Sequence, residues 1–199
     1  MKRRTVLKRL GIASAAVVVT PSLLGMLNSC TTEAKVWKPQ FFSQEGGRIM
    51  QKLVDVFLPK TELPSASELN ISEFIDRYLL EVYENEEQMA FKTAYAKVVK
   101  TLKEQAQKEV DDLEAKDLHL FLDNNLKVKD EIDTERQNNP NYKGLTTSEC
   151  LDSIKWMCIN AYINTEKIGE EVLAYNPVPG AYYCDDLENL TEGKRWSLS

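Results

Sequence analysis

The sequence predicts an all-α fold, a bundle of about five helices with an irregular C-terminal tail. From residue 43 onwards, apolar residues recur at three- and four-residue spacing, as they do along a helix with one buried face. No segment alternates apolar and polar residues as a half-buried strand would. We therefore expect helices packed around one hydrophobic core.

Capping residues and a proline mark the ends of the first two helices. Ser43 can cap a helix whose apolar stripe is ended by Pro59. A polar, proline-bounded loop over residues 60–67 follows. Asn70 is placed to cap the second helix, whose apolar positions continue to Tyr83.

The third and fourth helices differ in strength. The third starts near Glu86 and carries an apolar face to Ala106, opposite a face of Lys, Glu and Gln. The fourth, over residues 118–126, is weaker and fades into the charged run of residues 127–136.

The fifth helix is predicted to be the most buried. It opens at Thr146, which Glu149 follows at capping-box spacing. Trp156, Met157 and Ile159 widen its apolar arc, which is typical of a helix covered on more than one side.

The N-terminus has the layout of an export signal. A basic head containing Arg3 and Arg4 precedes an apolar stretch over residues 10–27. The paired arginines resemble a twin-arginine signal, a route that carries folded proteins. A membrane span needs about 20 apolar residues. This stretch is shorter and contains Pro21, so we favour a signal over residues 1–29 to a permanent anchor.

A possible site of lipidation follows the signal. Residues 27–30 resemble a bacterial lipobox, which would make Cys30 the lipidated first residue of the mature protein. Cleavage nearby, with an ordinary Cys30 or none retained, is the alternative. We interpret residues 30–42 as a tether and residues 43–199 as the helical domain, with the tail beginning at residue 174.

The mature chain is acidic. The whole sequence has a formal net charge of −6, and removing the signal takes away five basic and no acidic residues, which lowers the charge to −11. Such a charge argues against nucleic acid and against anionic lipid surfaces as partners.

Three cysteines follow Cys30. An oxidising periplasm permits one internal disulfide, and the preferred pair is Cys158, on a helix, with Cys184, in the tail. The alternative is three unpaired cysteines, two of them buried. No pair has the Cys-x-x-Cys spacing of a zinc or redox site.

Motifs for catalysis and cofactor binding are absent from the sequence. It contains neither the Gly-x-Gly-x-x-Gly turn of a Rossmann site nor the Cys-x-x-Cys-His of a covalent haem. The single histidine, His119, has no paired nucleophile or second ligand. We assign no catalytic, cofactor-binding or metal-binding residue to this chain.

The tail combines turn-forming and aromatic residues. Two prolines and a glycine fix an ordered turn, and three tyrosines supply rigid contact area. Composition alone favours a strap across the chain's own bundle, with contact to a partner as the alternative. The residues concerned are Tyr175, Pro177, Pro179, Gly180, Tyr182 and Tyr183.

Five segments occur in a characteristic order: the twin-arginine head and residues 37–42, 56–61, 73–76 and 178–184. This ordered set resembles the gluconate 2-dehydrogenase subunit 3 family over nearly the whole chain. Two departures indicate a divergent member. Pro64-Ser65-Ala66 stands where the family commonly has Pro-Gly-Ala, and residues 160–163 replace a Gly-Tyr-Phe stretch.

The resemblance implies a small, non-catalytic subunit of a sugar or sugar-acid dehydrogenase. Its partner would be a large flavoprotein of the glucose–methanol–choline type that holds FAD, often with a cytochrome c subunit. The small subunit would export the flavoprotein, stay bound through the tail, and be periplasmic and membrane-associated. The alternative is a stand-alone cell-surface lipoprotein that binds a small ligand or a surface partner.

Overall fold

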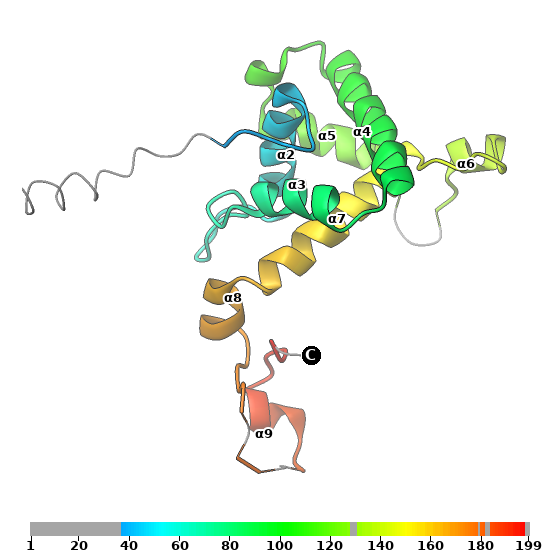
Figure 1. Cartoon of the computed structure of the whole chain (residues 1–199). Helices are drawn as coiled ribbons and strands as arrows, with labels where there is room; N and C mark the ends of the chain where they lie inside the picture. The colour runs from blue at the N-terminus through cyan, green and yellow to red at the C-terminus, as the bar shows by residue number, and fades with distance from the viewer. Residues whose placement is uncertain (1–36, 128–130, 179, 182–183, 198–199) are drawn as a thin grey trace, which may run out of the picture. The chain divides into compact units, whose positions relative to one another are not determined.

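The computed structural model describes residues 37–127, 131–178, 180–181 and 184–197 (Figure 1). This part of the chain is helical and contains no strand, which confirms the all-α prediction. Its elements are α2 (Gln44–Phe57), α3 (Ile71–Glu81), α4 (Asn85–Ala106), the 3-10 turn η1 (Val110–Asp112), α5 (Ala115–Asn125), α6 (Thr134–Asn138), α7 (Thr147–Ile163), α8 (Glu166–Glu171) and α9 (Leu187–Thr191).

The five longer helices form the predicted bundle. α7 packs against α3 and α4, and α2 contacts α3, α4, α5 and α7. The apolar stripes seen in the sequence supply one continuous core, in which each of the five helices buries large side chains. Removing these side chains from water is the main source of stability. Representative members are Leu53, Ile75, Phe91, Phe121 and Ile154.

Two of the three predicted helix caps form as expected. Ser43 Oγ accepts the N–H of Gly46, and Thr146 forms a reciprocal capping box with Glu149. Asn70 precedes α3 as predicted, but its side chain makes no capping hydrogen bond. Its backbone lies in the left-handed region at φ 56°, a conformation that asparagine tolerates, so it serves as a turn residue instead.

The burial predicted for α7 is correct on one face only. Met157 is buried, whereas Trp156 is 60% and Ile159 is 39% exposed. These two residues lie on the side of the helix opposite Ile154 and Cys158, because residues three and four apart share a face. The prediction for Trp156 and Ile159 is therefore wrong within the described chain.

The end of the predicted tether belongs to the bundle. Phe41 and Phe42 are buried, and the carboxylate of Asp76 in α3 accepts the N–H groups of residues 40–42. Residues 30–36 lie outside the described part of the chain.

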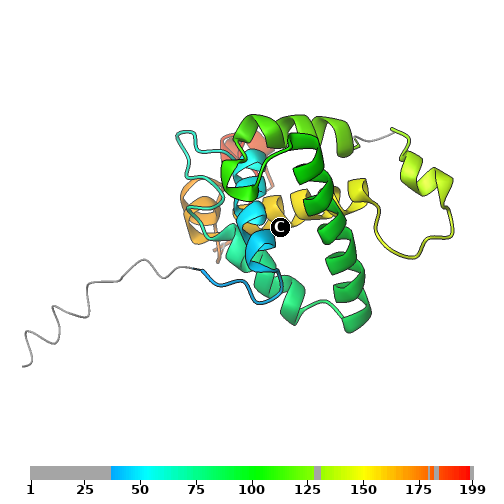
Figure 2. The same ribbon diagram turned by 90° about the horizontal axis from the view of Figure 1, so that it is seen from above.

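The segment that carries α6 lies to one side of the bundle in both views (Figures 1 and 2). Asp133 caps α6, and Arg136 pairs with Glu149 in the first turn of α7. Polar contacts at the start of α7 thus hold this segment to the bundle.

Candidate interaction surface

The C-terminal segment after α8 folds back on itself. The N–H of Ala174 donates to the carbonyl of Arg195 at 3.0 Å, and the N–H of Ser197 donates to the carbonyl of Ala174 at 3.0 Å. Ala174 and Trp196 therefore form an isolated parallel bridge. The chain between them, which includes α9, is a loop closed at its base.

The described residues of this loop from 175 to 190 face solvent, whereas Thr191 in α9 is buried. Tyr175, Pro177 and Gly180, all predicted to contact a partner, are exposed, as is every other described residue from 175 to 190. A strap across the bundle would bury some of them, so the strap favoured by composition alone is wrong for these residues. Pro179, Tyr182 and Tyr183 lie outside the described part of the chain.

The predicted Cys158–Cys184 disulfide is not formed. Cys150, Cys158 and Cys184 are all free in the described residues. Cys158 is buried, with its Sγ 3.9 Å from the carbonyl oxygen of Val54, whereas Cys184 is exposed in the loop. A disulfide needs its two Cβ atoms within about 4.5 Å, which a core position and an exposed loop do not provide here.

Burial also makes the two core thiols unreactive. It raises the pKa of Cys150 to about 12 and that of Cys158 to about 12, the latter helped by the charge of Asp55. Because the thiolate is the reactive form, neither group is suited to nucleophilic or redox chemistry near neutral pH.

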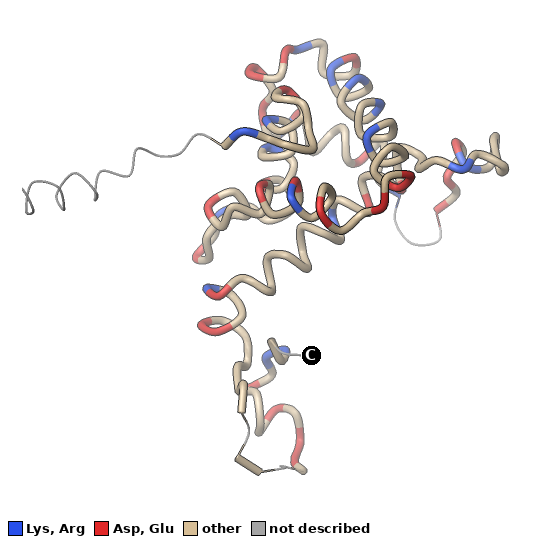
Figure 3. The backbone as a smooth tube through the Cα atoms, viewed as in Figure 1, with Lys and Arg blue, Asp and Glu red and all other residues tan. Residues whose placement is uncertain are grey.

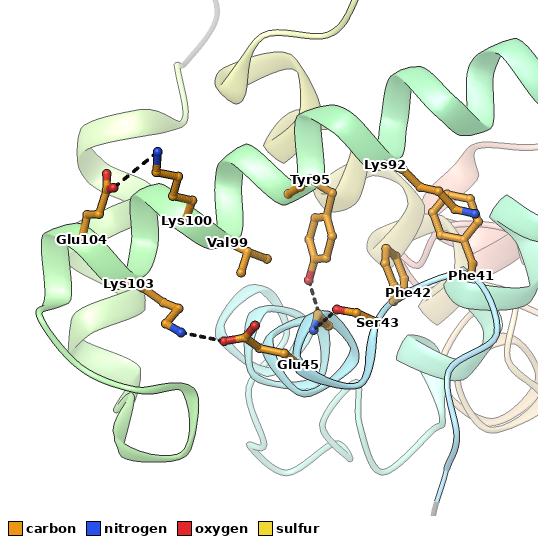
Figure 4. A pocket seen from close by; sticks show the side chains of 12 residues that line it. Phe41, Phe42, Ser43, Glu45, Lys92, Tyr95, Val99, Lys100, Lys103 and Glu104 are labelled. Atoms are coloured by element: carbon orange, nitrogen blue, oxygen red, sulfur yellow. Dashed lines mark hydrogen bonds and ion pairs between the residues drawn. The ribbon is translucent and has the colours of Figure 1, made fainter.

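A cleft of about 600 Å³ lies between α2 and α4 (Figure 4). Its floor is aromatic: Tyr95 donates its hydroxyl to the carbonyl of Gly46 at 2.8 Å, and Lys92 lies 4.5 Å from the centre of the Phe41 ring. Burial raises the pKa of Tyr95 well above its ordinary value, so the phenol stays neutral. The cleft can hold an apolar body between ammonium groups.

Most polar groups of this cleft are already paired, and among the described residues Lys92 has only the Phe41 ring as a partner. Lys103 forms a 2.8 Å ion pair with Glu45, a hydrogen bond that raises the pKa of the lysine, and Ser43 Oγ is used by the helix cap. Its lining includes no histidine or cysteine. The arrangement offers no base beside a nucleophile.

A second hollow, a groove of about 340 Å³, lies between α3 and α7. The exposed rings of Phe74 and Trp156 line it, and Phe74 stacks on Tyr78 with ring centres 5.9 Å apart. Asn160 and Asn164 contribute amide groups. Sequence reasoning missed this surface, although the exposed apolar stripe of α7 is readable from residue spacing.

Other chemical sites are not found among the described residues. They contain no cluster of three or more histidine, cysteine or acidic groups placed to hold a metal ion, and His119 is exposed. In the same residues, none of the helices combines the length and apolar character of a membrane span. Arg3, Arg4 and Cys30 lie outside the described chain, so the signal and the lipidation site stay predictions.

Comparison with protein families gives one match. The model of the family described as gluconate 2-dehydrogenase subunit 3 matches residues 44–180, more than half of the chain. Comparisons with curated proteins and with solved structures gave no match. A subunit of this kind works in a dehydrogenase complex beside a catalytic partner. On this match, the chain belongs to the gluconate 2-dehydrogenase subunit 3 family.

Proposed function

We propose that this chain is the non-catalytic small subunit that exports, anchors and stabilises a periplasmic flavoprotein of the glucose–methanol–choline type. The flavoprotein would oxidise a sugar or sugar acid with its own FAD, and a cytochrome c subunit could take the electrons. Family membership supports the subunit role. The closed C-terminal loop supports a position for the interface, because it is folded and yet exposes Tyr175 and Val178.

The C-terminal loop exposes apolar and aromatic side chains. Its described residues from 175 to 190 are exposed, so burial within this chain does not account for the apolar side chains among them. Apolar and aromatic side chains on a folded, exposed segment are typical of contact with another protein. Tyrosine in particular brings large contact area with few rotatable bonds.

Export and anchoring rest on the N-terminal sequence. A twin-arginine head at Arg3 and Arg4 suits transport of an already folded, FAD-loaded partner that has no signal of its own. Lipidation at Cys30 would then hold the pair at the membrane.

The test is affinity purification of the tagged full chain from its native membrane fraction, followed by a visible absorbance scan. A large co-purifying protein with a flavin spectrum is expected. Deletion of residues 176–199 should release it while far-ultraviolet circular dichroism stays that of a folded bundle.

Two results would count against the proposal. If the deletion variant still binds the flavoprotein, the loop is not part of the interface. A solitary, colourless protein from gently solubilised membranes would favour the stand-alone lipoprotein, for which the cleft between α2 and α4 supplies a ligand-sized space.

A further inference from the structure

The exposed side of α7 carries an apolar stripe. Trp156, Ile159 and Ile163 follow one another at three- and four-residue spacing, so they share a face. Trp156 and Ile159 are exposed and Ile163 is half-buried. Phe74 of α3, 51% exposed, lines the same groove as Trp156. These four residues are called the outer α7 patch below.

The opposite side of α7 is the core side, with Leu151, Ile154 and Cys158 fully buried. α7 is therefore apolar on two sides, the pattern of a helix that is covered all round. Single exposed apolar residues are common on soluble proteins. A run of them on one helix face, joined to an aromatic ring of the next helix, is the pattern of an interaction site.

Charge separates this face from the other exposed helices. Residues 156–165 contain no charged side chain, and Figure 3 draws this half of α7 in one colour. α4, by contrast, carries four lysines and three glutamates, drawn in blue and red in the same figure. The centre of a protein–protein interface is depleted of charge, whereas a solvated surface is not.

In the sequence, the uncharged stretch that carries the patch is followed by a second one, most of which belongs to the C-terminal loop. After residue 38, the two longest stretches without a charged residue are 156–165 and 172–184, and only α8 separates them. α8 carries three glutamates and one lysine, Lys167, which pairs with Glu171, so its net charge is −2. Acidic residues resume at Asp185. An apolar surface flanked by carboxylates is complementary to an apolar groove flanked by lysine and arginine.

We propose that the outer α7 patch is the central docking site for the catalytic subunit, which receives it in an apolar groove with a basic rim. The inference rests on the proposed function and places the main contact on α7, with the C-terminal loop as its extension. Helix-in-groove binding uses anchors at this spacing, and tryptophan is one of the residue types enriched among dominant contact residues.

The test compares matched variants of the tagged full chain. Trp156→Glu and Ile159→Glu place a charge in the patch, and Leu120→Glu places one on α5 at a site that is 64% exposed. Bound flavin per tagged chain, read from visible absorbance, measures the flavoprotein retained. We expect bound flavin per chain to fall about tenfold or more for each patch variant and to change little for Leu120→Glu. Thermal unfolding by circular dichroism should be alike for all three.

A crosslinking experiment identifies the surface that covers the patch. A photoreactive amino acid at position 156 should join the chain to the flavoprotein, at a peptide with apolar residues between lysines or arginines. The same group at position 120 should not react with it.

The possible negative results separate the docking site from the proposed function. If wild type binds the flavoprotein and both patch variants bind it equally well, the docking site is overturned and the subunit role stands. If wild type binds none, the proposed function falls and this inference falls with it. A dimer of the isolated chain that Ile159→Glu dissolves, without loss of flavoprotein, would assign the patch to a second copy and overturn the inference.

Discussion

Asp76 Oδ1 accepts the backbone N–H of Phe42 at 3.0 Å, so a residue of α3 fixes the segment that leads into α2. The same oxygen accepts the N–H of Phe41, and Oδ2 accepts that of Gln40 at 2.7 Å. Asp76 is only 1% exposed, so two buried donors and one part-buried donor, that of Gln40, depend on one carboxylate. This contact joins residues 37–42 and 73–76, two of the segments that carry the family resemblance.

Replacing Asp76 is expected to destabilise the bundle. Asp76→Ala leaves buried N–H groups without an acceptor, at a cost of about 3 kcal/mol in the free energy of unfolding. Asp76→Asn keeps one oxygen and should cost less. Urea unfolding of the full chain measures both, with the exposed Arg77→Ala as a control within about 0.5 kcal/mol of wild type. Equal unfolding midpoints for Asp76→Ala and Arg77→Ala would contradict the role of the carboxylate.

The loop after α2 depends on Tyr162. Its hydroxyl donates to the carbonyl of Pro64 at 2.7 Å, which joins the two segments in which this chain departs from the family pattern. Tyr162→Phe should lower the free energy of unfolding by about 1 kcal/mol and speed hydrogen exchange of the loop amides. Tyr142→Phe, at an exposed position, is the control. Unchanged exchange at residues 60–67 would show that other contacts hold the loop.

The three cysteines that follow Cys30 should differ in reactivity. In the folded protein at about pH 8, a maleimide should label Cys184 and spare Cys150 and Cys158, whose thiols stay protonated and buried. Denaturant should expose all three. Peptide mass spectrometry reads each site separately, and a linked peptide containing Cys158 and Cys184 would contradict the structure.

Acid should release the α6 segment. Asp133 accepts the Thr146 hydroxyl at 2.5 Å, and Arg136 Nε donates to Glu149 at 2.9 Å. Burial alone would raise the pKa of Asp133, but hydrogen bonds from Thr146 and from backbone N–H groups outweigh it and lower that pKa. The hydrogen bond from Arg136 lowers the pKa of Glu149.

The direction of the pH effect follows from these lowered pKa values. Their stabilisation is complete above the unfolded-state pKa, about 4 for carboxylates, and is lost as the pH falls through the lower folded-state pKa. The melting temperature of Glu149→Gln should therefore be lower than that of wild type at about pH 6. The difference between the two melting temperatures should disappear toward about pH 3. Glu62→Gln, in an exposed loop, should match wild type at both values. A constant gap would mean that the charge of Glu149 is not the cause.

Periodicity was sufficient to predict the five longer helices, because their apolar faces are the core. It did not predict α6, which is short and has no buried residue. Asp133 and Arg136 hold α6 in place through contacts with α7, and such contacts cannot be recognised from a local sequence pattern. Asn70 was placed correctly at the start of α3, but its backbone angle, which the sequence does not reveal, removes its side chain from the cap.

The candidate surface was predictable only in part. Partner contact through the loop with Tyr175 and Pro177 was expected from the resemblance, whereas composition alone favoured a strap across the bundle. The outer face of α7 was expected to be buried. Hydrophobic spacing indicates that a face will be covered, and it does not say whether the cover belongs to the same chain. The predicted disulfide was wrong for a similar reason, because spacing in the sequence does not give the distance between Cys158 and Cys184.

The bridge between Ala174 and Trp196 has a consequence for binding rates and affinity. A free tail loses conformational entropy when a partner orders it, and that loss weakens binding. Here the two ends of the segment are joined when the chain folds, so the entropy of closing the loop is lost before any partner arrives. The complex should consequently dissociate more slowly than one formed by an unclosed tail of the same sequence.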